Sequence, residues 1–210
     1  MPATQGVFPS FIDGPAGALQ IRIDLPATRP RALGVLCHPH TLHGGTLTNK
    51  VIHQVAHAFN DAGAIAVRFN FRGAGESAGS YDEGRGETDD VCAVVDWARR
   101  RWPDLPLWLA GFSFGAYVSL RAVDASDAAM IVTVAPPVNH FAFDTLVMPS
   151  VSWLVVQGGA DEVVPADAVT TWVRSLSRPP EYELMPDVGH FFHGRLRPLR
   201  ERVIRFAERR

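Results

Sequence analysis

Short hydrophobic runs alternate along the chain with longer segments in which hydrophobic residues recur every three or four positions. The short runs, such as Ala32–Cys37, have the length of a strand and are hydrophobic at successive positions, which is typical of a strand covered on both faces. The longer segments have the spacing of amphipathic helices, as Val51, Val55 and Phe59 illustrate within 49–63. The alternation predicts an α/β protein with a mostly parallel sheet and helices on both of its faces.

These elements follow one another in a regular order. An antiparallel hairpin is expected first, because Val7–Ile12 and Ala18–Leu25 flank a turn rich in glycine. Strands are then expected at Ala32–Cys37, Ala64–Phe71, Leu107–Ala110, Ala129–Ala135, Val151–Gln157 and Glu181–Met185. Helices are expected at Asn49–Gly63, Asp89–Trp102, from Phe114 onward, at Ala166–Leu176 and at Arg195–Arg209. In such a sheet a functional site is expected at the carboxyl ends of the strands.

The composition is that of an ordinary globular domain, with 47% hydrophobic and 20% charged residues among 210. We therefore expect one domain over residues 1–210. The net charge of -2 provides no basic stripe for nucleic acid. No hydrophobic run approaches the ~20 residues of a membrane-spanning helix, and Met1–Asp13 lacks the pattern of a signal peptide. The prediction is a cytoplasmic protein without nucleic-acid or membrane partners, in which Cys37 and Cys92 are free thiols.

The chain must turn sharply at Ser113, because the strand expected at Leu107–Ala110 runs almost without a spacer into the helix that begins at Phe114. Gly111 and Gly115 lie two residues on either side of this serine, and their small size lets the strand and the helix pass closely. On such a turn the hydroxyl is exposed above the sheet edge, beside the N–H groups of a helix N-terminus. This G-x-S-x-G arrangement resembles the nucleophile elbow of the α/β-hydrolase superfamily.

The resemblance implies the α/β-hydrolase fold, with a serine, an acid and a histidine in that order along the chain. The acid is expected at Asp161, in the loop after a buried strand, and Glu162 and Asp167 are the alternatives. The histidine is expected at His190, which follows a glycine in the loop before the last helix, and His193 is its competitor. A serine hydroxyl needs such a base to become nucleophilic, and the imidazole needs a carboxylate to hold its tautomer.

The same resemblance implies an oxyanion hole built from two backbone N–H groups. One is expected to belong to Phe114, the residue after the nucleophile. The other is expected to belong to His40, in the loop after the first buried strand, with Thr41 or Leu42 as alternatives. This loop begins His38-Pro39-His40, so proline stands where the superfamily usually has glycine. The segment is similar to that of the dienelactone-hydrolase-like group, whose members have cysteine rather than serine at the elbow.

Two other kinds of site were weighed against these residues. His38, His40 and His43 are a candidate zinc set, but no carboxylate or cysteine at ligand spacing completes it. The glycines of the segment 72–79 suggest a dinucleotide fingerprint, but their spacing is one residue too long and no helix is expected to begin there. We therefore expect neither a metal nor a cofactor.

The interval Val138–Pro149, where many members of the superfamily carry a lid, is too short for a lid domain. The resemblance thus implies an open serine hydrolase that cleaves carboxylic esters of small or short-acyl substrates through an acyl-enzyme. The residues expected to line its substrate pocket are Leu42, Phe112, Phe141, Phe143, Phe191 and Phe192. The alternatives are a thioesterase or peptidase with the same three side chains, and a non-catalytic ligand-binding protein of this fold.

Overall fold

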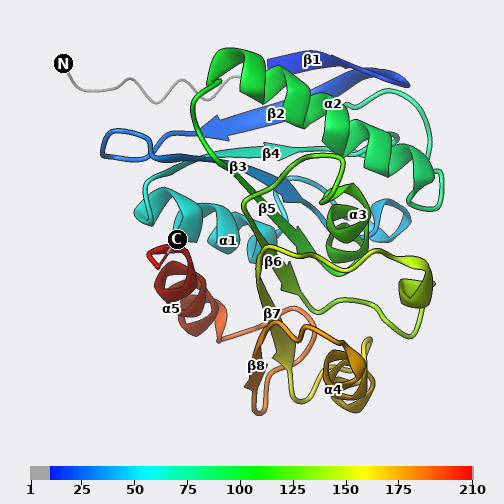
Figure 1. Ribbon diagram of the computed structural model, residues 1–210. Helices are drawn as coiled ribbons and strands as arrows, with labels where there is room; N and C mark the ends of the chain where they lie inside the picture. The colour runs from blue at the N-terminus through cyan, green and yellow to red at the C-terminus, as the bar shows by residue number, and fades with distance from the viewer. Residues whose placement is uncertain (1–9, 210) are drawn as a thin grey trace.

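The structure, a computed structural model, describes residues 10–209 and contains an eight-stranded sheet (Figure 1). The strands are β1 (Ser10–Gly14), β2 (Gly17–Asp24), β3 (Ala32–Cys37), β4 (Ala64–Phe69), β5 (Leu107–Phe112), β6 (Met130–Val134), β7 (Ser152–Gly158) and β8 (Glu181–Met185). They lie in the order β1-β2-β4-β3-β5-β6-β7-β8. The pairs β1–β2 and β2–β4 are antiparallel and the other pairs are parallel, which confirms the expected mostly parallel sheet with an antiparallel hairpin at its start.

Helices cover both faces of the sheet, as the alternating pattern predicts. They are α1 (Lys50–Asp61), α2 (Arg85–Arg101), α3 (Phe114–Ala122), α4 (Ala166–Ser175) and α5 (Leu196–Ala207). Figure 1 shows α1 and α5 on one face and α2, α3 and α4 on the other. Each face has its own hydrophobic core: Phe59 of α1 and Phe206 of α5 belong to one, and Val94 of α2 and Val118 of α3 belong to the other.

The order of the strands reverses direction in the middle of the sheet, at β3. The strand β4 pairs with one side of β3, and β5 pairs with the other side. The segments that follow β3 and β5 therefore diverge at the carboxyl edge, which is the topological switch point where α/β sheets bind ligands. His38 begins the loop after β3, and Ser113 is the turn after β5.

The helix α2 begins one turn earlier than the hydrophobic spacing predicts. The expected range is Asp89–Trp102, whereas α2 covers Arg85–Arg101. The carboxylate of Glu87 accepts hydrogen bonds from the N–H groups of Asp82 and Gly84 just before the helix. Because these bonds satisfy donors at the N-terminus, the helix begins before its first hydrophobic residue.

The opening hairpin is formed by β1 and β2, with Gly14 opposite Gly17 at the turn. Residues 7–9 of the first expected strand lie outside the described residues. Between β6 and β7, the segment 135–151 contains only the 3-10 helix η2 (Phe143–Thr145), so the fold has no lid. Within the part of the chain that the structure describes, no helix is long and hydrophobic enough to cross a membrane.

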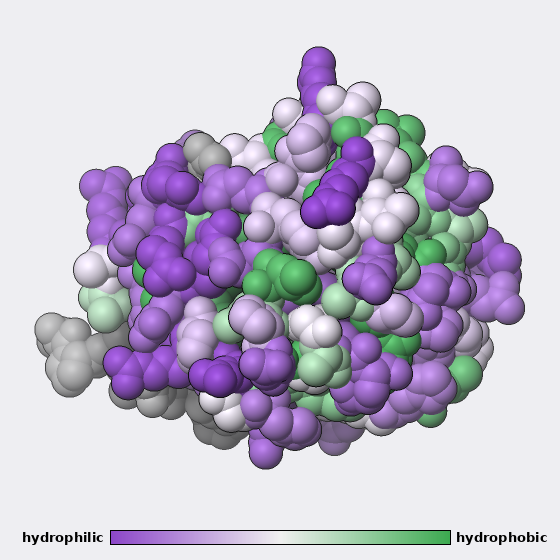
Figure 2. Space-filling view, turned by 90° about the horizontal axis from the view of Figure 1, so that it is seen from below, coloured by the Kyte–Doolittle hydropathy of each residue, from purple (hydrophilic) through white to green (hydrophobic). Residues whose placement is uncertain are grey.

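Exposed hydrophobic side chains are scattered over the surface. On the face that Figure 2 shows, they occur in small groups separated by hydrophilic residues. Three exposed hydrophobic residues belong to loops at the carboxyl edge of the sheet: Leu42 after β3, Val163 after β7 and Phe191 after β8. This edge, which also holds Ser113, therefore has accessible hydrophobic side chains.

Candidate active site

Ser113 is the single residue between β5 and α3, and its backbone conformation is strained, with φ 53° and ψ -120°. A positive φ outside glycine costs of order 1–3 kcal/mol and persists where the surrounding structure enforces it. Here the N–H of Ser113 donates to the carbonyl oxygen of Val134 on β6 at 2.8 Å, which holds the turn against the sheet. The sharp turn predicted from the sequence is present, and it brings the serine to the N-terminus of α3, where negative charge is favoured.

Two glycines make room for this turn. A Cβ on Gly111 would lie 2.1 Å from the carbonyl oxygen of Gly115, and a Cβ on Gly115 would lie 2.2 Å from the carbonyl oxygen of Cys37. Both distances are far below van der Waals contact, so each position requires glycine for lack of space. The second contact also shows that the loop after β3 lies directly against the N-terminus of α3.

The side chains of Ser113, His190 and Asp161 form a continuous chain of hydrogen bonds. The Oγ of Ser113 lies 3.1 Å from Nε2 of His190, and Nδ1 of His190 lies 2.8 Å from Oδ2 of Asp161. The three residues follow β5, β8 and β7, whose carboxyl ends meet at one edge of the sheet, and all three are buried. The structure thus brings together the three residues that the sequence selects, from positions far apart in the chain.

The carboxylate of Asp161 has four hydrogen-bond donors around it. Its Oδ1 accepts from the N–H groups of Val163 and Val164, and its Oδ2 accepts from Nδ1 of His190 and Nε2 of Gln157. Burial alone would raise the pKa of Asp161, but the hydrogen bonds from His190 and from the backbone outweigh it and hold that pKa below its ordinary value. An ionised carboxylate only accepts hydrogen bonds, so Nδ1 of His190 donates and Nε2 is free to accept the serine proton.

Gln157 is a residue that the sequence reasoning missed. It is fully buried near the end of β7, and its Nε2 lies 3.1 Å from Oδ2 of Asp161 and 3.0 Å from the carbonyl oxygen of Val164. The amide therefore bonds to the same carboxylate oxygen as the imidazole and ties it to the loop after β7. The signal that could have indicated it is a single polar residue at the end of the otherwise hydrophobic run Trp153–Gln157.

The alternative residues lie outside this chain of hydrogen bonds. Glu162 is exposed, and its Oε2 accepts the backbone N–H of His190 at 3.1 Å, so it contacts the main chain of the histidine rather than the ring. Asp167 is exposed in the first turn of α4. His193 is exposed as well, and its ring lies 6.0 Å from the ring of Phe191.

The loop after β3 places its first two histidines in different environments. His38 is completely buried; its Nδ1 donates to the carbonyl oxygen of Pro39 at 2.6 Å, and its Nε2 accepts the N–H of Phe71 at 3.0 Å. Burial lowers the pKa of His38 to about 4, so the ring is neutral. His40 is partly exposed, and its ring lies 5.0 Å from the ring of Phe114, the first residue of α3.

The two N–H groups expected to form an oxyanion hole are those of Phe114 and His40. Within the described chain, neither of them donates a hydrogen bond to another protein group. Unpaired N–H groups at the start of a helix are the donors that a developing negative charge requires. The contact between Gly115 and the loop after β3 brings the two peptide segments that carry them close to each other.

The three histidines of this loop are not arranged around a common point. The rings of His40 and His43 stack on each other with centroids 4.5 Å apart, whereas both nitrogens of His38 are used by the backbone. Among residues 10–209, no group of three or more His, Cys, Asp or Glu side chains is placed to hold a metal ion. Cys37 is a buried free thiol, and Cys92 is a partly buried one.

The hydrophobic residues expected to line a substrate pocket divide into two groups. The buried ones are Phe112, Phe143 and Phe192. The accessible ones are Leu42, Phe141 and Phe191, and of these Leu42 is 67% and Phe191 43% exposed. The ring of Phe191 lies 5.1 Å from the ring of His190, and the ring of Phe141 lies 5.5 Å from that of Phe114. Phe141 and Phe191 therefore lie beside residues next to Ser113.

Residues 30–146 match the family model described as serine aminopeptidase, S33 (Hydrolase_4). The chain belongs to this α/β-hydrolase family. The matched segment contains the loop after β3 and the turn at Ser113, and it ends before the loops that hold Asp161 and His190.

Relatives of the family extend the similarity over most of the chain. An uncharacterized protein of Rickettsia prowazekii is 33% identical over 193 residues, which are 87% of this chain and 81% of that protein. An α/β serine hydrolase without a lid from Xanthomonas campestris is 43% identical with a TM-score of 0.93, over 96% of this chain and 94% of that one. An α/β serine hydrolase homologue from Coxiella burnetii is 44% identical with a TM-score of 0.92, over 95% of this chain and 96% of that one. The lidless hydrolase fold therefore spans the loops of Asp161 and His190 as well.

Proposed function

We propose that this protein hydrolyses carboxylic esters of small or short-acyl substrates, with Ser113 as the nucleophile, His190 as the general base and Asp161 as the residue that orients the histidine. The observation that supports this best is the chain of hydrogen bonds, with 3.1 Å from Oγ of Ser113 to Nε2 of His190 and 2.8 Å from Nδ1 of His190 to Asp161. In this arrangement each group faces the atom with which it exchanges or shares a proton.

In the first half of the reaction, Oγ of Ser113 attacks the ester carbonyl carbon while its proton passes to Nε2 of His190. The carbonyl oxygen becomes an oxyanion, which the N–H groups of Phe114 and His40 bind. When the tetrahedral intermediate collapses, the bond to the alkoxy oxygen breaks and the leaving alcohol takes the proton from His190. An acyl group then remains on Ser113.

In the second half, a water molecule attacks the acyl carbon and gives one proton to Nε2 of His190. The oxyanion forms again, and its collapse breaks the bond to Oγ of Ser113, which recovers the proton from the histidine. The products are a carboxylic acid and the original enzyme. Asp161 stays ionised throughout and stabilises the imidazolium that forms in each half.

The expected acyl preference follows from the absence of a lid and from the accessible side chains near the serine. The segment between β6 and β7 folds over no part of this edge as a separate domain, and Leu42 and Phe191 are open to solvent. An open site with a few hydrophobic side chains buries little of a long acyl chain, so binding energy grows only over the first few methylenes. Esters of small or short-acyl substrates are therefore the proposed substrates.

An amide bond is the second candidate, because the matching family model is named for a serine aminopeptidase. The three side chains act in the same way on an ester and on an amide, and they differ only in the leaving group. An aminopeptidase must also hold the free amino group of its substrate. Aminoacyl nitroanilides therefore belong in the same test as the esters.

The experiment is a steady-state assay with nitrophenyl esters from acetyl to dodecanoyl, aminoacyl nitroanilides and an acyl thioester, combined with labelling by a fluorophosphonate. The wild type should turn over the short esters and carry the label on Ser113, and Ser113→Ala should lose both. Ser175→Ala, at an exposed serine on α4, is the matched control and should keep both. Labelling of another residue, or turnover that survives Ser113→Ala, would contradict the proposal. Labelling without turnover of any substrate would favour the non-catalytic ligand-binding alternative.

A further inference from the structure

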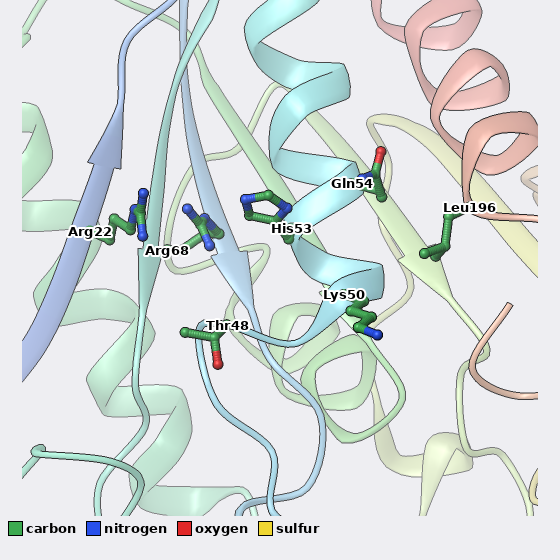
Figure 3. Close-up of a pocket in the computed structure, with 7 residues that line it drawn as sticks. All are labelled: Arg22, Thr48, Lys50, His53, Gln54, Arg68 and Leu196. Carbon is green, nitrogen blue, oxygen red and sulfur yellow. The ribbon is translucent and has the colours of Figure 1, made fainter. Parts of the chain in front are cut away.

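A polar hollow lies on the face of the sheet that carries α1 and α5, and it plays no part in the mechanism above. It has a volume of about 250 Å³ and is lined by Arg22, Thr48, Lys50, His53, Gln54, Arg68 and Leu196. In Figure 3, Arg22 and Arg68 extend from the neighbouring strands β2 and β4, and His53 of α1 lies next to Arg68. Thr48 and Lys50 lie at the start of α1 (Figure 3). The lining thus has three cationic side chains and no carboxylate.

Arg68 has hydrogen-bonding capacity to spare in this hollow. Its side chain is 1% exposed; Nε and Nη2 donate to Oδ2 of Asp24 at 3.0 and 2.6 Å, and Nη1 donates to the carbonyl oxygen of Leu47 at 2.9 Å. A guanidinium has five N–H donors, so two remain. These bonds also fix the orientation of the guanidinium, so binding of a ligand would cost little further conformational entropy there.

Arg22 has an unsatisfied donor at the same place. Its Nε is buried and makes no hydrogen bond; the closest carboxylate oxygen, Oδ1 of Asp24, is 3.6 Å away. Burying a donor without an acceptor costs free energy, so such a group usually has a partner. The single carboxylate of Asp24 is shared between Arg22 and Arg68, and it cannot neutralise both.

Lys50 adds a third positive charge at the rim. It is the only lysine among the 210 residues, all other cationic side chains being arginine or histidine. Its side chain is exposed and, within the described chain, forms no ion pair. The flexible four-carbon stem lets the ammonium turn toward the hollow.

The charge balance here differs from that at other arginines of the protein. Arg202, for example, lies between two carboxylates, those of Glu181 and Glu183, each 3.0 Å away. Around the hollow, the three positive charges of Arg22, Lys50 and Arg68 stand against one carboxylate, that of Asp24, which pairs with the two arginines. This leaves an excess of two positive charges in a chain whose net charge is -2. The excess is local and lies beside unpaired N–H donors.

We propose that this hollow binds a phosphoryl group, as inorganic phosphate or as a phosphate monoester. A phosphate monoester carries a charge of about -1.5 to -2 at neutral pH and has three strong acceptor oxygens, which matches two excess positive charges and several free donors. A carboxylate has one negative charge and two oxygens, so it would leave one positive charge and some of the free donors without a partner. Guanidinium forks, a hydroxyl and an imidazole are the side chains that recognise phosphate in proteins.

His53 agrees with this assignment and provides a reporter for it. Burial, together with the positive charges of Arg68 and Arg22 and with His57, lowers the pKa of His53 to about 4, although Asp24 acts in the opposite direction. A bound phosphate would offset the two arginine charges. The pKa of His53 should therefore rise when the hollow is filled.

The binding test is titration of the full chain with inorganic phosphate and with phenyl phosphate at low ionic strength, followed by calorimetry and by the ring resonances of His53. Saturable binding of one phosphate per chain below about 10 mM, with a rise in the pKa of His53, is the expected result. Sodium chloride and acetate at equal ionic strength are the comparison anions, and binding that they match would overturn the proposal. So would a titration without a saturable change.

Two variants locate the site. Arg22→Gln and Lys50→Gln each remove one charge from partly or fully exposed side chains, and each should weaken phosphate binding about tenfold, as the loss of a charged hydrogen bond does. Arg85→Gln, which removes one exposed charge from the start of α2, is the matched control and should bind like the wild type. Equal weakening in all three variants would show that binding depends only on the net charge of the protein, and it would contradict a site in the hollow.

Lys50 allows an independent chemical readout. Trinitrobenzenesulfonate modifies amino groups, and peptide mapping separates the single lysine from the N-terminal amine. Phosphate should protect Lys50 from modification at the concentrations that saturate binding and leave the N-terminal amine reactive. Unchanged reactivity of Lys50 in saturating phosphate would contradict its place in the site.

A phosphate monoester occurs both on soluble molecules and on lipid head groups, and sedimentation with vesicles distinguishes the two sources. If vesicles of phosphatidylcholine with phosphatidic acid retain the wild type but not Lys50→Gln, and free phosphate releases it, the hollow takes a lipid head group. If phenyl phosphate binds and the vesicles do not, it takes a soluble monoester. Binding of neither ligand would overturn the proposal.

Discussion

Two loops at the carboxyl edge of the sheet each hold one buried histidine, and the two rings are bonded in opposite ways. His38, after β3, uses both ring nitrogens on the backbone, with Pro39 as acceptor and Phe71 as donor. His190, after β8, uses both on side chains, with a carboxylate on Nδ1 and the hydroxyl of Ser113 on Nε2. An amide N–H does not release its proton near neutral pH, whereas a serine hydroxyl does so when its oxygen attacks a carbonyl. Burial is common to both histidines, and the partner of Nε2 decides whether the ring can act as a base.

Replacing each histidine by glutamine, which keeps one donor and one acceptor, tests the different roles of the two rings and should give the largest effect. His190→Gln should lower kcat/KM for a short ester by about 10⁴-fold or more, because an amide cannot take up the serine proton. His38→Gln should leave the activity of the folded fraction nearly unchanged. Ester hydrolysis, corrected for the folded fraction by circular dichroism, gives both values. Comparable losses in the two variants would contradict the division of roles.

The next largest effect is expected at the partner of Nδ1. Asp161→Asn should lower kcat/KM about 10³- to 10⁴-fold, because the amide holds the imidazole in the wrong tautomer and no longer stabilises the imidazolium. The variant keeps an oxygen for the N–H groups of Val163 and Val164, so the fold should survive.

Glu162→Gln is the matched control for that substitution. Glu162 is the neighbouring acid, and its oxygen accepts the backbone N–H of His190, a bond that a glutamine oxygen can also accept. Its activity should stay within a few-fold of the wild type. If Glu162→Gln lost as much activity as Asp161→Asn, the acid of the site would have to be reassigned.

A third difference between the loops should appear in stability rather than in activity. The pKa of His38 in the folded protein is about 4, below its ordinary value of 6.5. As the pH falls below ~6.5, His38 binds a proton in the unfolded chain but not in the folded one. The free energy of unfolding therefore declines by about 1.4 kcal/mol per pH unit until ~pH 4. Between ~pH 6.5 and ~pH 5 the wild type should therefore lose about 2 kcal/mol of unfolding free energy through this residue.

Urea denaturation of the wild type and His38→Gln at several pH values checks this expectation. The variant should lack the part of the pH dependence that His38 contributes, and its curve should be flatter over this range. His53→Gln should flatten the curve in the same way, because burial and the neighbouring positive charges also lower the pKa of His53 to about 4. Parallel curves for the wild type and His38→Gln would show that the pKa of His38 is the same in the folded and the unfolded protein, which would contradict the expectation.

The residues of the site that share a sequence motif could be predicted, and those that depend on distant neighbours could not. Gly111, Ser113 and Gly115 lie within five residues, so their local geometry follows from their spacing. Asp161 and His190 were found through the order of the superfamily and the strand each one follows. The sequence also showed the strands well, and β8 covers the expected Glu181–Met185.

The environments of His38 and Gln157 were beyond the reach of the sequence. The acceptor at Nε2 of His38 is occupied by Phe71, which is 33 residues away, and no local pattern encodes that pairing. Gln157 is likewise a polar exception in a hydrophobic strand. Its partner, Asp161, comes within hydrogen-bonding distance only because the loop after the strand folds back. The start of α2 was missed because Glu87 bonds to a turn that is itself irregular. In each case a side chain is paired with a group that lies outside its own element.

The smallest effect is expected at the side chains around the serine. Leu42→Ser should lower kcat/KM for medium acyl esters a few-fold and leave acetyl esters unchanged, since removing one hydrophobic contact costs about 1 kcal/mol or less when the residue stays largely exposed. Leu42 is 67% exposed, so unfolding free energy should not change. Leu25→Ser, at a residue 58% exposed just after β2, is the matched control and should affect neither ester. A loss that is independent of acyl length would mean that Leu42 shapes the backbone of the oxyanion loop rather than the acyl site, because His40 lies two residues away and its Nδ1 accepts the N–H of Leu42.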